Sequence, residues 1–167
     1  MGRKNSDPDH PNSAVLTAPG ILLDHINTPI FVLDTDHEIV FWNNAIATFT
    51  GHSETEAKQM DMAGQAFYHD GRRSKTLADK VIDAPESVDS EYDVPRVQDV
   101  SYTLYGDTST MVDGHGNERH IKFSAAPLYE DGELFGAVEM VEDRTDEVRR
   151  HEQLTDLVAE LDSTMNA

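Results

Sequence analysis

The sequence predicts an α+β protein with a single five-stranded antiparallel sheet and short helices on one face of that sheet. Two apolar runs, residues 30–34 and 39–43, flank an acidic turn in the pattern of a hairpin. Three more runs, residues 108–112, 118–128 and 134–143, are separated by turns that contain glycine. Because a lone hairpin cannot bury its own faces, we expect the early pair to join the late three in one sheet.

The chain before the first hairpin divides into two parts. Residues 1–17 are polar and rich in Pro, Asp and Asn, which predicts a disordered arm. Leu22, Leu23 and Ile26 recur at helical spacing, so residues 18–26 are expected to form a short N-terminal helix that leads into the first strand.

Short capped helices are expected directly after the hairpin. Asn43 or Asn44 can cap a helix over residues 45–50. Ser53, followed three residues later by Glu56, forms a capping box that starts another helical turn. These segments lie between the two groups of strands in the chain, so we expect them to cross one face of the sheet.

A better helix is expected over residues 72–84. Leu77 and Val81 lie in its apolar stripe, and Pro85 stops it. Residues 85–102 are acidic and contain two prolines, which predicts an extended loop before the third strand.

The C-terminal segment, residues 147–167, is expected to form an amphipathic linker helix after a folded domain of residues 18–146. Its seam follows the alternating four- and three-residue spacing of a coiled coil. The first two seam positions are polar, so the apolar part is short for a coiled coil that is stable alone. The seam positions are Glu147, His151, Leu154, Val158, Leu161 and Met165.

The surface is expected to be very acidic. The 167 residues include 13 Lys and Arg against 32 Asp and Glu, a net charge of −19, and the acid is spread along the whole chain. Asp outnumbers Glu by 19 to 13 and only five Lys are present, a composition that resembles proteins of extreme halophiles. Such a charge disfavours nucleic acid and anionic membranes as direct partners. With no cysteine, no secretory signal and no bilayer-length apolar run, we expect a cytoplasmic location.

Both ends of the domain resemble a PAS domain. The segment PIFVLDTDHEIVFWNNAIATFTGHSETE has the hairpin, the Asn at a helix start and the Thr-Gly pair that precede the next capped turn in that family. The segment DGHGNERHIKFSAAPLYEDGELFGAVEMVEDRTDEV resembles the closing half, including the Asp-x-Thr junction formed by Asp143 and Thr145. The resemblance covers about residues 20–147 and departs at residues 85–102, which are longer than common PAS loops.

The resemblance implies a sensory module that is not an enzyme. Such a module binds a small molecule or carries a dimer interface, and passes its state through the C-terminal helix. The halophilic versions resemble those of archaeal transducer proteins and sensor kinases. The implied partners are therefore a second copy of the chain and an output kinase or chemotaxis-type signalling domain, which we expect on another chain or segment. Two alternatives stay open: a ligand-free scaffold for dimerisation or protein interaction and, more remotely, a small-molecule enzyme.

The cofactor of such a module is unknown here. PAS photoreceptors that use a flavin–cysteine adduct or a coumarate thioester need a cysteine, and the chain has none, which excludes both chemistries. Haem-binding members use a His in the helical region, where His69 lies, but a solvated His beside Asp70 is the favoured interpretation. His115 and His120 flank a turn without further ligands at metal spacing, which disfavours zinc.

A ligand pocket in this fold would lie between the inner face of the sheet and the short helices. Alternation along the strands predicts the inner face, and four apolar residues of the helical region would form the opposite wall. A small filled core explains the same residues equally well. The candidate pocket residues are Phe31, Leu33, Ile46, Phe49, Phe67, Leu77, Ser109, Met111, Ile121, Phe123, Ala125, Ala137, Glu139 and Val141.

Two features among these positions carry specific hypotheses. A carboxylate at Glu139 costs several kcal/mol in a pocket unless it is paired, so Glu139 either accepts a hydrogen bond from a ligand N–H or O–H or has the opposite parity and faces water. Asp143 is expected to pair with a nearby base or to cap the helix that begins near Thr145. Asp143 and Thr145 are thus the expected signal-relay junction, with an ordinary helix cap as the equal alternative.

Overall fold

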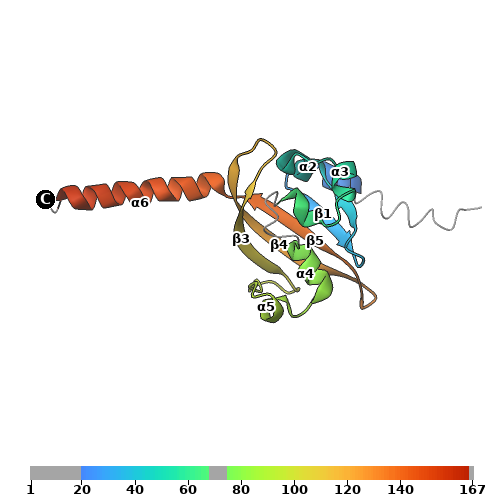
Figure 1. The fold of residues 1–167 in the computed structure, drawn as a ribbon. Helices are drawn as coiled ribbons and strands as arrows, with labels where there is room; N and C mark the ends of the chain where they lie inside the picture. Colours follow the sequence, from blue (N-terminus) through green and yellow to red (C-terminus); the bar gives the residue numbers. More distant parts are fainter. Residues whose placement is uncertain (1–19, 68–74, 166–167) are drawn as a thin grey trace, which may run out of the picture.

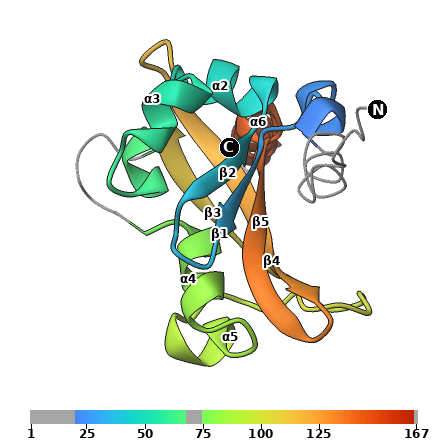
Figure 2. The same cartoon turned by 90° about the vertical axis from the view of Figure 1, so that its right-hand side faces the viewer.

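The computed structural model describes residues 20–67 and 75–165 of the chain. Figures 1 and 2 show a curved sheet with short helices over one of its faces and one long helix that leaves the domain. The expectations for the arm of residues 1–17 and for His69 lie outside the described residues.

The sheet has five antiparallel strands in the order β2-β1-β5-β4-β3. This topology confirms the predicted fold class, because the early hairpin and the three late strands form one sheet. The strands are β1 (Ile30–Asp34), β2 (Ile39–Trp42), β3 (Tyr105–Val112), β4 (Glu118–Glu130) and β5 (Glu133–Asp143).

The two parts of the sheet meet at β1 and β5. Ile30 pairs with Met140, and Asp34 pairs with Gly136 at the other end of the ladder. Position 136 needs a glycine, because a Cβ there would collide with the carbonyl oxygen of Leu33. The last strand of the chain is therefore the central strand of the sheet.

Short helices cover the inner face of the sheet, and α4 packs against β4 and β5. A further helix at residues 20–24 precedes β1. The other helices are α2 (Asn44–Thr50), α3 (Glu54–Lys58), the 3₁₀ helix η1 (Ala63–Ala66), α4 (Leu77–Asp83), α5 (Val88–Glu91) and α6 (Thr145–Met165).

The start of α4 differs from the sequence expectation. The expected helix began at residue 72; residues 72–74 lie outside the described residues, residues 75 and 76 are not helical, and α4 begins at Leu77. Its start is fixed by a capping box, in which the Thr76 side chain accepts from the Asp79 amide and the Asp79 carboxylate accepts from the Thr76 amide. The Thr76–Asp79 capping box therefore explains why the helix begins at Leu77.

The third strand and the loop before it also differ. β3 begins at Tyr105, three residues before the expected 108, because Tyr105 pairs with Ala125 of β4. The loop predicted over residues 85–102 contains a short helix, α5, and its Arg96 forms an isolated bridge with Tyr105. The segment predicted as an extended loop thus includes one short helix.

Asn43 is a buried junction between four segments. Its Oδ1 accepts hydrogen bonds from the amides of Ile46 and Ile30, each at 3.0 Å. Its Nδ2 donates to the carbonyl of Leu23 at 3.0 Å and of Thr28 at 2.8 Å. The cap predicted for α2 thus also holds the N-terminal helix and the start of β1.

The core between the sheet and helices is aromatic at one end. The ring centroids of Phe31 and Trp42 lie 5.6 Å apart, and both rings pack against Phe67 at 5.7 Å and 6.1 Å. These tilted contacts join β1, β2 and the end of η1 into one buried cluster.

Helix α6 projects away from the domain (Figure 1). Every described side chain from Arg149 onward is exposed. Leu154, Leu157, Val158 and Leu161 are between 50% and 59% exposed, although they form a continuous apolar stripe. Within the described residues, none of the helices combines the length and the apolar character needed to cross a membrane.

Candidate functional site

A cavity of about 20 Å³ lies between α4 and the inner face of the sheet. A space of this size holds about one water molecule. Lys75 and the first turn of α4 form one wall, and strands β4 and β5 form the other. The lining residues are Phe67, Lys75, Thr76, Leu77, Lys80, Ile121, Phe123, Glu139 and Val141.

Most of the pocket residues predicted from the sequence line this cavity or lie in the core around it. The candidates that line it are Phe67, Leu77, Ile121, Phe123, Glu139 and Val141. The candidates that are buried in the surrounding core without lining it are Phe31, Leu33, Ile46, Met111, Ala125 and Ala137. Side-chain packing therefore fills most of the volume that the sequence left open to a ligand.

Two candidates lie elsewhere. Phe49 lines an outer cleft at the base of α6, because its position on α2 faces the end of β5 instead of the inner cavity. Ser109 pairs with Ile121 but is only half-buried and does not line the cavity, because α4 packs against β4 and β5 instead of β3. Ser109 has the inward parity predicted for it and Phe49 packs against the core, but neither residue lines the inner cavity.

Glu139 points inward and is only 4% exposed. Its Oε1 accepts a hydrogen bond from the backbone N–H of Ala78 at 2.8 Å, so the carboxyl group lies at the N-terminal end of α4. Burial raises the pKa of Glu139 to about 8, against the opposing effect of that hydrogen bond. The sequence offered two interpretations, a ligand partner or a solvated side chain, and missed a helix terminus as the partner.

The first turn of α4, which bonds to Glu139, carries a second buried carboxylate. Asp79 is 1% exposed and accepts hydrogen bonds from the amide and the hydroxyl of Thr76, each at 2.8 Å. His37, in the β1–β2 turn, places Nδ1 2.7 Å from Asp79 Oδ1 and Nε2 3.1 Å from Asp83 Oδ1. The hairpin turn is thereby tied to both ends of α4.

Two lysines flank the cavity, and sequence reasoning missed both. Lys75 precedes α4, and Lys80 lies within it. Their ammonium groups lie 6.0 Å and 5.6 Å from the centroid of the Tyr92 ring. The scarcity of lysine in the chain was the only signal in the sequence that could have marked them.

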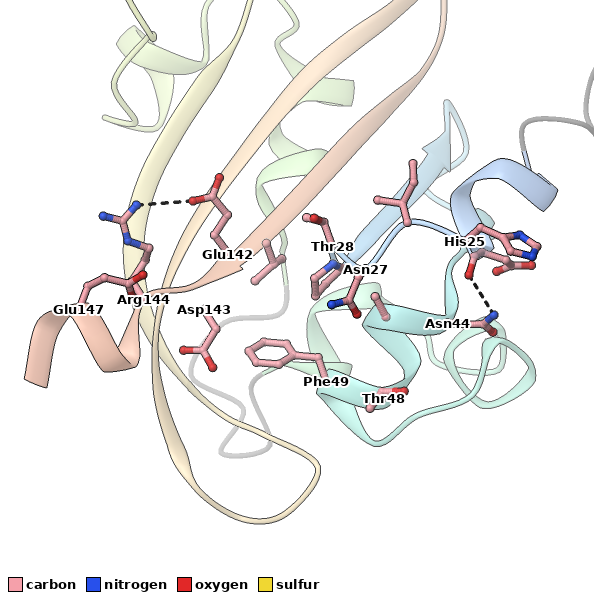
Figure 3. A pocket seen from close by; sticks show the side chains of 15 residues that line it. His25, Asn27, Thr28, Asn44, Thr48, Phe49, Glu142, Asp143, Arg144 and Glu147 are labelled. Atoms are coloured by element: carbon pink, nitrogen blue, oxygen red, sulfur yellow. Dashed lines mark hydrogen bonds and ion pairs between the residues drawn. The ribbon is translucent and has the colours of Figure 1, made fainter.

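A second, open cleft of about 650 Å³ lies at the base of α6. Figure 3 shows the Phe49 ring of α2 pointing across this cleft toward Asp143, where β5 ends. Arg144 pairs with Glu142 at 3.6 Å on the same side, and Asn44 donates to the carbonyl of Asp24 at 3.2 Å on the other. The cleft thus lies between the N-terminal segment and the start of the output helix.

The junction between β5 and α6 is a compact polar network. Asp143 Oδ1 accepts from the Thr145 amide at 2.9 Å, and Asp143 Oδ2 lies 3.6 Å from Arg119 Nη1. The Thr145 hydroxyl, fully buried, accepts from the His120 amide at 2.9 Å. Asp143 therefore makes both interactions anticipated for it, a cap at the helix start and an ion pair.

Arg119 links this junction to the β3–β4 turn. Its Nε donates to Asp113 Oδ2 at 2.8 Å, and Asp113 Oδ1 accepts from the amides of His115 and Asn117, each at 2.9 Å. Burial disfavours the charged Asp113, but these hydrogen bonds outweigh it and lower its pKa to about 2. Among the described residues, no cluster of His, Asp and Glu could hold a metal ion.

Comparison with known proteins identifies the family. Residues 22–144 match the sequence profile of the PAS fold. The chain belongs to the PAS family. The architecture agrees: the PAS domain of a protein from Colwellia psychrerythraea superposes with a TM-score of 0.54 at 20% identity, over 79% of this chain and 98% of that one. The PAS domain of an HTR-like protein from Haloarcula marismortui gives 0.50 at 11% identity, over 78% and 98%.

A curated relative of this PAS domain is a haloarchaeal transducer protein. Halobacterial transducer protein 9 of Halobacterium salinarum is 33% identical over 162 residues. The match covers 95% of this chain but 32% of the relative. The chain thus spans about a third of the length of that transducer.

Proposed function

We propose that this PAS domain is a cytoplasmic sensory module that binds a small molecule between α4 and the sheet and relays its state through α6 to a signalling partner. The observation that carries the proposal is the path of β5. Glu139 contacts α4, Val141 lines the same cavity, and Asp143 caps the output helix, all on one face of one strand. A shift of α4 would therefore act on the strand that leads directly into α6.

The small volume of the cavity means that a ligand would have to move α4 away from the sheet. Such a movement breaks the bond between Ala78 and Glu139 and leaves the carboxyl group available to a ligand N–H or O–H donor. The ligand would replace the helix terminus as the partner of Glu139. This exchange supplies two states that a ligand can bias.

Mass spectrometry of small molecules released from the protein, purified gently in molar KCl, tests the proposal. We expect a retained compound in stoichiometric amount, and its loss in a Leu77→Trp variant that fills the cavity. A chain that retains nothing and whose α6 responds to no compound in a metabolite library would contradict ligand sensing.

The second candidate function, a ligand-free dimerisation scaffold, is favoured by the apolar stripe of α6. Leu154, Val158 and Leu161 follow coiled-coil spacing and are exposed in the single chain. The acidic Glu152 and Asp156 point away from that seam, so two copies can approach along it in high salt despite their net charge. We propose that the chain forms a homodimer through α6 in either function, with an output kinase or chemotaxis-type protein as the further partner.

Light scattering in molar KCl tests the dimer. Leu161→Glu places a charge in the seam and is expected to give monomers. Ala159→Glu adds the same charge at an exposed position off the seam, so it serves as a matched control that stays dimeric. Equal masses for the two variants would show that α6 is not the interface.

A further inference from the structure

The inference concerns an open cleft of about 500 Å³ beside α4, separate from the cleft at the base of α6. Two of the five lysines of this very acidic chain, Lys75 and Lys80, converge there on the ring of Tyr92. The remaining lining residues come from the segment after α5 and from strands β3 and β4. They are Asp93, Val94, Asp107 and Phe123.

This cleft adjoins the inner cavity. Lys75, Lys80 and Phe123 line both spaces. A molecule held in the cleft therefore touches α4 on the side where its first turn bonds to Glu139. Occupancy of the cleft and the position of α4 are mechanically linked.

The charges in the cleft are balanced. Lys75 lies 3.1 Å from Asp83, and this hydrogen bond raises the pKa of Lys75 and keeps it an ammonium ion. Two exposed carboxylates, Asp93 and Asp107, also line the cleft. A simple anion would meet these carboxylates, and a simple cation would meet the two lysines.

We propose that the cleft binds a small zwitterion with an apolar body, of the free α-amino acid class. Its carboxylate would lie between Lys75 and Lys80, its ammonium group toward Asp93 and Asp107, and its body against Tyr92 and Phe123. At molar salt the screening length is about 3 Å, so only the charges that a ligand contacts directly contribute to its binding, and a zwitterion can contact both the lysines and the carboxylates. This proposal rests on the proposed sensory function and assigns a ligand class to the outer cleft, which shares Lys75, Lys80 and Phe123 with the inner cavity.

Calorimetric titration in molar KCl tests it with three matched probes. L-Phenylalanine carries both charges, N-acetyl-L-phenylalanine only the negative one, and L-phenylalaninamide only the positive one. We expect L-phenylalanine to bind at least about tenfold more tightly than either derivative. L-Leucine, with an aliphatic body of similar size, is expected to show the same preference over its own derivatives.

Two variants assign the binding to the cleft. Lys75→Gln combined with Lys80→Gln is expected to weaken binding at least about tenfold. Lys122→Gln removes one exposed lysine from the other face of the sheet and should leave binding unchanged, and Asp107→Asn tests the carboxylate side. Thermal melting of each variant is the control that checks whether it is folded.

The outcomes separate this inference from the proposed function. Equal or tighter binding of either derivative overturns the zwitterion assignment. Absence of binding by both amino acids at millimolar concentration overturns it as well. If mass spectrometry still finds a retained molecule of another class, the sensory function stands without this ligand class.

Discussion

The carboxyl oxygen of Glu139 lies 2.8 Å from the backbone nitrogen of Ala78, so the central strand of the sheet holds the first turn of α4. The contact joins the wall of the cavity to the strand that continues into the output helix. Glu139 is buried on the inward face of the strand, where a carboxyl group destabilises the fold unless it accepts a hydrogen bond. The amide of Ala78 supplies that hydrogen bond.

Glu139 gives the first prediction. Its pKa is raised from 4.5 to about 8 by burial, so between these values the folded state holds a proton that the unfolded state has lost. Stability is therefore full below pH 4.5 and falls as the pH rises toward 8, by on the order of a few kcal/mol. Denaturant unfolding of Glu139→Gln, which mimics the protonated form, should show a flatter pH dependence in this window and greater stability above it.

The opposite sign is expected at Asp113. Its pKa is lowered from 3.8 to about 2, so its contribution is present above pH 3.8 and is lost as the pH falls toward 2. Asp113→Asn keeps an acceptor for the turn amides but loses the charge opposite Arg119, and we expect a loss of about 1–3 kcal/mol at neutral pH. Acid unfolding curves of the variant and the wild type should converge near pH 2, and a constant difference across pH would contradict this account.

Asn43→Ala tests the buried junction. The substitution leaves the amides of Ile30 and Ile46 and the carbonyl groups of Leu23 and Thr28 without their partner. We expect a loss of about 2–4 kcal/mol, more than a helix cap alone would give. Asn44→Ala, one residue later and exposed, is the control and should cost less than about 1 kcal/mol.

The features that the sequence predicted correctly are local ones, which depend on residues close together in the chain. The hairpin, the capped starts of α2 and α3, the two glycine turns and the Asp143 cap depend on neighbours in the chain, and the structure places each as predicted. The inward parity of Ala137, Glu139 and Val141 also follows from alternation along a strand.

Features that depend on distant partners could not be predicted. The partner of Glu139 is 61 residues away, and the bond between His37 and Asp79 spans 42. The start of α4 is set by the Thr76–Asp79 capping box, which was not among the caps predicted from the sequence. The convergence of Lys75 and Lys80 on Tyr92 required the fold of residues 85–102, where the chain departs from the family pattern.

The relay junction gives a further prediction. Asp143→Ala removes the cap of α6 and one partner of Arg119, and we expect a loss of about 0.5–2 kcal/mol in stability, measured by denaturant unfolding. Asp143→Ser retains a capping oxygen without the charge, so it should recover most of this loss. If both variants match the wild type in stability and in the response of α6, the junction has no role in the relay.

The most direct test of the account measures whether the state of Glu139 reaches α6. The chain has no cysteine, so Arg149→Cys, at an exposed position of α6, allows a single fluorinated label whose ¹⁹F resonance is followed against pH. We predict a transition with a midpoint near pH 8 that disappears when Glu139→Gln is added. Identical titration curves in the two backgrounds would contradict a relay from the cavity through β5 to the output helix.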